Sequence, residues 1–596
     1  MSAKACVRYR ISIPRPSDHF VHVTMEIDDA PEGLVVAMPV WTPGSYLVRE
    51  FSRHVSGVTA ARVSGDPVGV EKIEKNRWLI DAKPGKRVDV SYRVYANELT
   101  VRTSHVDADH AFLHPAGTYL FVEGREAERV TVAVEAPEGW RTATQLPLTG
   151  EATYTAENLD ALLDAPLEIG THQVLTFEVG DVPHRIALYG EGNFDRDELL
   201  GDTATICHAA TEMFAGDHPS ASYTFIYHVL EGAGGGLEHL DSSVCGFAPF
   251  SFRPERKYRG ALSLISHEYF HLWNVKRIRP RELGPFDYQN ENYTRLLWVA
   301  EGFTSYYQDR ILLAADLLPV PEFLDNLARM IRVSLETPGR LVDPVAESSF
   351  DSWIKLYRPH EGIRNATISY YLKGALVALL LDLTIREATE GERSLDDVMR
   401  ALWAQYRARP GEGYTEEELL GFLEEAAGRS LADEIAAWVH TTEELPFEAA
   451  FAAFGLELVP EKADEEPKAY LGVTTKKDGG KVKVREVLAG TPAEAAGLAA
   501  DDELVAIDGW RLGDLKERLA ERAPGDEVAL TIARRSRLRK IVVTAGEAPD
   551  VDRVLRPIED ADDRARNRFL GWTGADLATA AEKPAPPPKS PRPRPI

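Results

Sequence analysis

The chain has 596 residues, which is too long for one hydrophobic core and predicts roughly three to five domains. Its composition, 44% hydrophobic and 27% charged, is that of soluble globular proteins, and no uncharged run is long enough to cross a bilayer. Because the formal net charge is -26, the chain repels nucleic-acid phosphates. We therefore expect no nucleic acid and no membrane among its partners.

Two further features bear on the compartment of the protein. The three cysteines, Cys6, Cys207 and Cys245, are too few and too scattered for a disulfide framework or a cysteine zinc site. The few residues before the first expected strand leave no room for the apolar core of a signal peptide. These observations predict a cytoplasmic protein.

Residues 1–180 are dominated by strands whose apolar residues alternate, and they predict an N-terminal all-β domain of β-sandwich type. The turn Trp41-Thr42-Pro43-Gly44-Ser45-Tyr46 is rich in aromatic residues, and it either packs within this domain or reaches a neighbouring active site. The packing role is the more common one for such turns. The clearest strand patterns are Val7 to Ile13, Val21 to Ile27, Val88 to Val94 and Val130 to Val134.

The rest of the chain predicts a multi-domain α+β protein. Two capping patterns, Thr415 with Glu418 and Ser430 with Asp433, mark helix starts in its helical part. The proline-rich end of the chain is expected to be disordered. In order, the segments are a mixed strand and helix domain at 181–345, a helical domain at 346–460, an acidic linker at 461–467, a short-strand domain at 466–547 and a C-terminal extension at 548–596.

The mixed domain contains a metal-binding pattern, His267-Glu268-Tyr269-Phe270-His271. It lies in a helical segment, and residues four apart on a helix share one face, so two imidazoles can bind one cation. The intervening Glu268 is offset toward a water molecule on that cation. The spacing therefore indicates a zinc hydrolase.

A third ligand is needed, because catalytic zinc sites usually combine three protein ligands with one open position. Glu301 lies in the otherwise apolar stretch Trp298 to Phe303, where an unpaired carboxylate would be costly to bury. The alternative is that the histidines bond to backbone carbonyls and that Glu301 pairs with an arginine such as Arg277. All three residues together favour one zinc ion per chain held by His267, His271 and Glu301.

The pattern extends beyond its core as His267 to Arg277, and this stretch resembles peptidase family M61, the glycyl aminopeptidases among the gluzincin metallopeptidases. The resemblance implies that the N-terminal β domain precedes a thermolysin-like catalytic domain, and that the helical domain completes the active site. It also implies a zinc aminopeptidase that removes small N-terminal residues, Gly and Ala above others, from peptides with a free N-terminus. The natural substrate and the oligomeric state stay open.

A glycine-rich loop follows an apolar strand and ends in Gly235-Gly236-Leu237-Glu238-His239. Glycines allow a substrate backbone to approach closely, and a carboxylate there can pair with an amino group. The segment is similar to the gluzincin motif Gly-Ala-Met-Glu-Asn, which implies that Glu238 binds the substrate's α-amine; His239 departs from the motif. The alternatives are a plain surface loop or a phosphate loop, but no Lys with Ser or Thr follows.

A tyrosine before Lys373-Gly374 is the expected donor to the oxyanion of the tetrahedral intermediate. The resemblance assigns this role to Tyr371, although the adjacent Tyr370 leaves the choice between them open, and either can instead be a core residue. The implied reaction is peptide hydrolysis by a metal-activated water, with Glu268 as general base and Tyr371 as oxyanion donor. Gly235, Gly236 and Glu238 are the expected substrate-binding residues.

The short-strand domain at 466–547 resembles a PDZ domain, with Tyr470-Leu471-Gly472-Val473 in the position of the carboxylate-binding loop. Such a loop can receive a peptide C-terminus, although a purely structural role is equally open. Two other functions therefore compete with the aminopeptidase. One is a zinc endopeptidase with no amine anchor, and the other is a non-catalytic PDZ protein that binds peptide ends.

Overall fold

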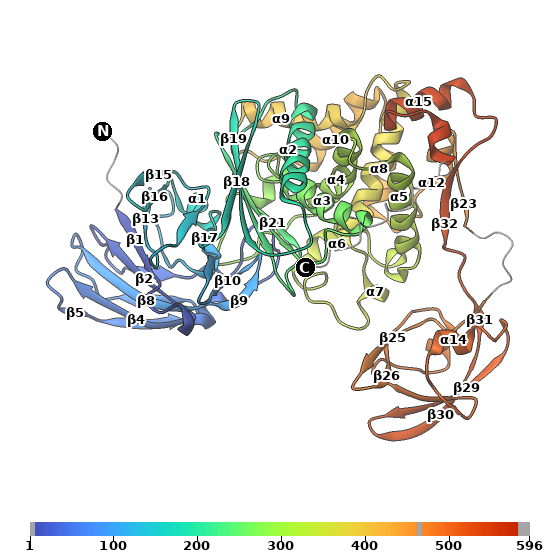
Figure 1. Cartoon of the computed structure of the whole chain (residues 1–596), viewed down its shortest axis with the longest axis horizontal. Helices are drawn as coiled ribbons and strands as arrows, with labels where there is room; N and C mark the ends of the chain where they lie inside the picture. Colours follow the sequence, from blue (N-terminus) through green and yellow to red (C-terminus); the bar gives the residue numbers. More distant parts are fainter. Residues whose placement is uncertain (1–5, 462–467, 582–596) are drawn as a thin grey trace, which may run out of the picture.

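The computed structural model describes residues 6–461 and 468–581, and Figure 1 shows the chain from its N-terminal sheets, in blue, to its C-terminal helix α15, in red. The predicted proline-rich tail and all but the first residue of the predicted linker lie outside the described residues. No helix in the described part of the chain combines the length and the apolar character needed to cross a membrane.

The N-terminal region contains an eight-stranded sheet and a four-stranded sheet that share one hydrophobic core. Its strands alternate as predicted: Val7, Tyr9 and Ile11 of β1 are buried, and the residues between them face outward. The strands of the first sheet, in order, are β15 (Leu148–Gly150), β16 (Thr153–Ala156), β13 (Val130–Glu135), β1 (Val7–Ser12), β2 (Phe20–Ile27), β8 (Val88–Tyr95), β4 (Val55–Arg62) and β5 (Pro67–Val68). Those of the second are β12 (Phe121–Val122), β3 (Val35–Ala37), β7 (Arg77–Ile80) and β6 (Val70–Glu74).

A third N-terminal sheet of five strands faces the domain that the sequence predicts to be catalytic, which is called the catalytic domain below. Its residues Val101, Phe112 and Ala143 form a buried cluster with Ala187, Ile226, Leu237 and Val244 of the neighbouring catalytic sheet. The two sheets therefore meet face to face at the domain boundary (Figure 1). In order, the strands of this sheet are β14 (Arg141–Ala143), β17 (Leu167–Gly170), β11 (His110–Leu113), β10 (Thr103–Val106) and β9 (Asn97–Thr100).

The catalytic sheet has the order β18, β19, β20, β22, β21, and helices cover its second face. Its first strand, β18 (Gln173–Val179), lies before the boundary at residue 180 that the sequence pattern predicts. The predicted boundary is placed too late because an alternating pattern shows that one face of a strand is buried, but it does not show which sheet the strand joins. The other elements are β19 (Val182–Gly190), β20 (Tyr223–Val229), β21 (Gly236–Glu238), β22 (Ser242–Phe247), α2 (Arg196–Met213), α3 (Glu255–Phe270), η5 (Trp298–Phe303) and α4 (Thr304–Ala314).

The predicted helical region continues the core of the catalytic domain without a break. Thr415 and Glu418 form the predicted capping box at the start of α10. The second capping box does not form, because α11 begins at Ala432 after Leu431, although Ser430 Oγ still accepts a long bond of 3.4 Å from the Ala432 N–H. The helices are α5 (Val320–Leu335), α6 (Val345–Phe350), α7 (Ile363–Ala366), α8 (Tyr370–Ala388), α9 (Leu395–Ala408), α10 (Glu416–Ala427), α11 (Ala432–His440) and α12 (Phe447–Ala452).

The short-strand domain is an insertion in this helical region. Strand β23 (Leu456–Pro460) leads into the domain, and β32 (Arg553–Pro557) leaves it and pairs with β23 as an antiparallel partner. These two strands form a stem that connects the domain to the helical region (Figure 1). It has its own core. Its elements are β24 (Ala469–Tyr470), β25 (Val473–Asp478), β26 (Lys481–Val487), α13 (Pro492–Ala495), β27 (Glu503–Ile507), β28 (Trp510–Arg511), α14 (Leu515–Leu519), β29 (Glu527–Arg534), β30 (Arg537–Thr544) and β31 (Gly546–Glu547).

The chain after the stem packs back onto the helical region through α15 (Asp563–Thr573). The Trp572 ring contacts Phe323 and Phe454, and its indole Nε1 donates to the Tyr306 hydroxyl at 3.2 Å. The first part of the predicted C-terminal extension is thus a component of the catalytic core rather than an appendage.

Candidate active site

The three predicted metal ligands converge from two helical elements, α3 and η5. His267 lies in the last turn of α3, and His271 caps that helix with helical backbone angles, so both imidazoles project to the same side. Glu301 lies in the π-helical turn η5, a rare conformation that often marks functional sites. Its Oε2 is 3.5 Å from His267 Nε2 and 3.3 Å from His271 Nε2.

The outward-facing nitrogen of each imidazole has an oxygen partner. His267 Nδ1 is 2.9 Å from Gln308 Oε1, and His271 Nδ1 is 2.7 Å from the Asn274 carbonyl oxygen. Since both partners are acceptors, each Nδ1 carries the proton and each Nε2 presents a lone pair to Glu301. This is the arrangement that a metal ion requires of histidine ligands.

The electrostatics of these three residues also fit a cation. Burial works against charge on His271, but Glu301 and Glu238 outweigh it and raise the pKa of His271 above its usual value. In the other direction, His271 and His267 hold the pKa of the Glu301 carboxyl below its usual value despite its burial. The site therefore stabilises added positive charge, and its donors, two imidazoles and a carboxylate, suit zinc.

Glu268 lies beside this set at the edge of the catalytic sheet. Burial raises the pKa of its carboxyl, although His267 and His271 oppose the rise. Its Oε2 has no hydrogen-bond partner among the described residues. A Cβ at Gly236 of β21 would overlap the Glu268 carboxylate, so the close approach of strand and helix requires glycine there.

Glu238 lies on β21, the edge strand of the catalytic sheet. It is 3% exposed, and its Oε1 has no partner among the described residues. Ligand atoms of Glu238, Glu268 and His271 all lie within 4.8 Å of one another. The next residue, His239, instead turns its Nδ1 to Asp164 Oδ1 at 3.1 Å, so this departure from the motif is accommodated by a hydrogen bond between domains.

The two adjacent tyrosines at the start of α8 occupy different environments. Tyr371 lines the same cavity as the metal-ligand set, and its ring lies 6.4 Å from that of His267. Its hydroxyl is 3.3 Å from the Tyr357 hydroxyl. Tyr370 is fully buried, does not line this cavity, and its hydroxyl has no partner in the described chain. The geometry thus separates two residues that the sequence left equivalent.

Sequence reasoning missed Arg102 and undervalued the Trp41 to Tyr46 turn. Arg102, from the N-terminal domain, donates to the Gly236 carbonyl at 3.1 Å and lines the cavity. Gly44 of the turn packs directly against the Glu238 carboxylate, where a Cβ would overlap it. The turn therefore reaches the site instead of only packing its own domain. Gln308 was also missed, although it follows Glu301 at helical spacing, which was the available signal.

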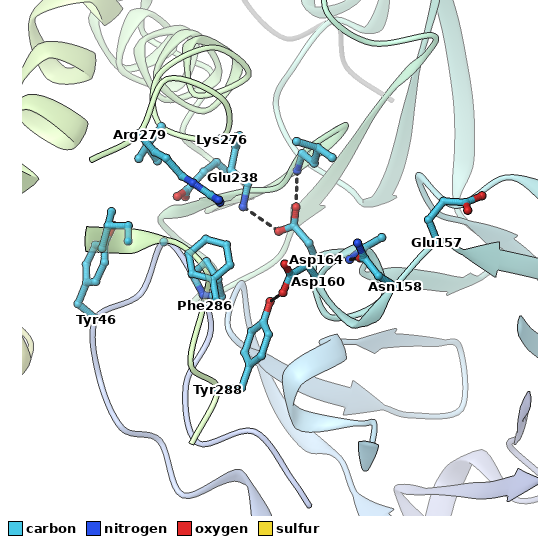
Figure 2. A pocket seen from close by; sticks show the side chains of 16 residues that line it. Tyr46, Glu157, Asn158, Asp160, Asp164, Glu238, Lys276, Arg279, Phe286 and Tyr288 are labelled. Carbon is cyan, nitrogen blue, oxygen red and sulfur yellow. Dashed lines mark hydrogen bonds and ion pairs between the residues drawn. The ribbon is translucent and has the colours of Figure 1, made fainter. Parts of the chain in front are cut away.

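Two cavities meet at Glu238. The first, of about 410 Å³, contains His267, His271, Glu301, Glu268 and Tyr371. The second, of about 340 Å³, lies between the domains and is lined by aromatic residues together with Lys276 and Arg279 (Figure 2). Glu238 and Gly44 line both and so form the wall that they share. Lys276 bonds to Asp164 at 2.9 Å, whereas the Arg279 guanidinium lies over the Phe286 ring.

Family models match three parts of the chain. The Peptidase M61 N-terminal domain matches residues 8–171, and the M61 glycyl aminopeptidase model matches residues 260–377. The chain belongs to peptidase family M61. A PDZ domain model matches residues 469–544 of this M61 peptidase, which identifies the inserted domain. The residues matched as M61 glycyl aminopeptidase include His267, Glu268, His271, Glu301 and Tyr371.

Solved structures extend the likeness to nearly the whole M61 chain. An aminopeptidase N family protein from Idiomarina loihiensis is similar over 95% of this chain and 100% of its own, with 29% identity and a TM-score of 0.89. A mutant M1 zinc metallopeptidase from Deinococcus radiodurans, bound to a Tyr-Ser-Ala substrate, matches 74% of this chain and 94% of its own, with 15% identity and a TM-score of 0.46. Comparison with curated protein sequences found no match.

Proposed function

We propose that this M61 peptidase is a zinc aminopeptidase in which His267, His271 and Glu301 hold one zinc ion. The hydrogen bonds that fix both Nε2 atoms toward Glu301 support this ligand set. A zinc ion bound there would activate a water molecule and polarise the scissile carbonyl. Glu268 accepts the proton of the attacking water and returns it to the leaving amine. Its raised pKa and its unpartnered oxygen suit both transfers.

Glu238 is the residue that favours an aminopeptidase rather than an endopeptidase. It is a nearly buried carboxylate with one unpartnered oxygen, on an edge strand beside Glu268 and His271. A cationic α-amine is the group that would satisfy this oxygen, because an unpaired buried charge is costly. Binding the amine at Glu238 places the first peptide bond beside the metal ligands and limits cleavage to single N-terminal residues.

Tyr371 donates its phenol hydrogen to the developing oxyanion, and the Gly235 and Gly236 backbone lets the substrate chain lie close to β21. The proposed preference for Gly and Ala rests on the family resemblance. The shared wall of Gly44 and Glu238 is consistent with small side chains on the metal side of it. Larger N-terminal side chains would have to enter the adjoining cavity of Figure 2.

The inserted PDZ domain is proposed to bind peptide C-termini along β25, which ends its sheet and pairs on one side only. We place the enzyme in the cytoplasm, with peptides as its partners.

The deciding experiment compares alanyl-peptide hydrolysis by the wild type and the Glu238→Gln variant, using each peptide both free and N-acetylated. Loss of the amine's ion pair should reduce kcat/KM for the free peptide by about 30- to 1,000-fold, and neither enzyme should cleave the acetylated peptide. Equal cleavage of both peptides by the wild type would instead identify an endopeptidase. A parallel series of Gly-, Ala-, Leu- and Phe-anilides tests the side-chain preference, and faster Leu or Phe cleavage would refute it.

A further inference from the structure

The interface between the N-terminal and catalytic sheets is half apolar and half polar. On β20, Ile226 and His228 are two residues apart, so both face the N-terminal sheet. On β11 of that sheet, Phe112 and His110 face back in the same way. Phe112 and Ile226 belong to the apolar half. The two histidines belong to the other half, where the Tyr189 ring stacks on His110.

Glu168 of β17 joins these histidines. It pairs in register with Phe112 and so shares the face of His110. Its Oε2 is 2.9 Å from His228 Nε2, and its Oε1 is 3.9 Å from His172 Nδ1. Ligand atoms of His110, Glu168 and His228 lie within 4.8 Å of one another. Three strands from two domains thus bring two imidazoles and a carboxylate to one point.

This cluster is closed to solvent, and several of its polar atoms lack hydrogen-bond partners in the described chain. His110 and Glu168 have no exposed surface, and His228 is 2% exposed. Neither ring nitrogen of His110 or His172 has a hydrogen-bond partner in the described chain, and Glu168 Oε1 also lacks one. Asp107 Oδ1, at 3.6 Å from His110 Nδ1, is too distant to bond. Buried polar atoms without partners are rare and point to an unseen occupant.

We propose that His110, Glu168 and His228 bind a second divalent cation of the zinc type, which links the N-terminal domain to the catalytic sheet. Imidazole nitrogens with one carboxylate suit zinc and its first-row neighbours, whereas calcium and magnesium require mainly oxygen ligands. The hydrogen bond between His228 and Glu168 alone would leave His110 unsatisfied. A cation satisfies all three residues at once.

The site is structural and separate from the catalytic ligand set. It shares no residue with His267, His271 and Glu301, and His110 is enclosed by protein, with the Tyr189 ring stacked on it at 3.7 Å. No open position for a substrate is needed. Its ligands come from β11, β17 and β20, so the cation would add a link between two sheets that also meet through apolar packing and through hydrogen bonds such as that of Arg102 to Gly236.

The test is the zinc content of the full chain, purified without metal-affinity chromatography, incubated with zinc and dialysed. By plasma mass spectrometry, the Glu168→Gln and His228→Gln variants should each hold one equivalent less than the wild type. The His271→Gln variant should separately lose the catalytic equivalent, so failure of the proposed function and failure of this site are distinguishable. His208→Gln, at an exposed histidine, is the matched control and should keep the wild-type content.

Unchanged zinc content in folded Glu168→Gln and His228→Gln variants would overturn the proposal. If these variants do not fold, crystals of the zinc-incubated wild type decide it by anomalous scattering. A peak above the zinc edge among His110, Glu168 and His228 supports the site. Its absence means that ordered water fills the cluster, and the proposal fails.

Discussion

The two histidine and carboxylate clusters of this protein differ in how their ligands are held. In the catalytic cluster, His267 and His271 each have an oxygen partner on the nitrogen that faces away from Glu301. In the inter-domain cluster, both nitrogens of His110 lack partners in the described chain. Preoriented ligands are typical of a site that must hold a reactive metal in a fixed geometry, whereas the second cluster depends on its occupant to order it.

Their surroundings differ as well. The catalytic cluster lines a cavity of about 410 Å³ together with Glu268, Glu238 and Tyr371, so it has groups that can act on a substrate. The inter-domain cluster is enclosed between two sheets and has no such groups. The comparison shows that a ligand set alone does not make an active site. The proposed base, amine anchor and oxyanion donor distinguish one cluster from the other.

The largest expected effect tests whether peptide hydrolysis depends on Glu268, which lies beside the catalytic cluster. Glu268→Gln removes the general base while keeping its shape, and should reduce kcat on alanyl peptides by about 10²- to 10⁴-fold. Zinc content should not change, since Glu268 is not a proposed ligand. Full activity in this variant would remove Glu268 from the mechanism and leave a PDZ peptide-binding protein as the better interpretation.

A smaller effect separates the adjacent tyrosines. Tyr371→Phe should reduce kcat by about 10²- to 10³-fold, the usual result of removing one oxyanion donor, with little change in KM. Tyr370→Phe is the matched control, because the Tyr370 hydroxyl is buried outside the cavity, and its kcat should stay close to that of the wild type. If the two results were exchanged, the roles of Tyr370 and Tyr371 would be exchanged too.

The smallest effect concerns zinc affinity and the hydrogen bonds that hold the Nδ1 atoms of His267 and His271 in the catalytic cluster. Gln308→Ala removes the partner of His267 Nδ1 and should weaken zinc binding at that site by about 10- to 100-fold. Competition with a chelator of known affinity measures this change. Gln405→Ala on α9 is the control. An unaltered affinity in Gln308→Ala would show that the preorientation of His267 does not depend on this bond.

The sequence predicted the catalytic cluster because its residues lie close together along the chain. His267 and His271 share a helix face, and Glu301 stands out as a carboxylate in an apolar stretch. The inter-domain cluster could not be predicted in this way. His110, Glu168 and His228 lie on separate strands, and they meet only after two domains dock.

The same limit applies to other features. Arg102 reaches the site from the N-terminal domain, and a single arginine in a strand turn carries no signal of that contact. The alternating pattern of β18 does not say that it joins the catalytic sheet. The short-strand domain was recognised, but its position as an insertion depends on the pairing of β23 with β32, which is separated from it by the whole PDZ domain.

That pairing makes the PDZ domain removable. Pro460 and Arg553 are cross-strand neighbours at the mouth of the stem, so a tight turn joining them would close β23 and β32 into an ordinary hairpin. The shortened enzyme would keep α15 and Trp572 in the catalytic core. A chain built in this way offers protein engineers an exchange point for recognition modules, at which hydrogen bonds such as those of Asn365 on α7 to Val487 and Ala489 would also have to be replaced.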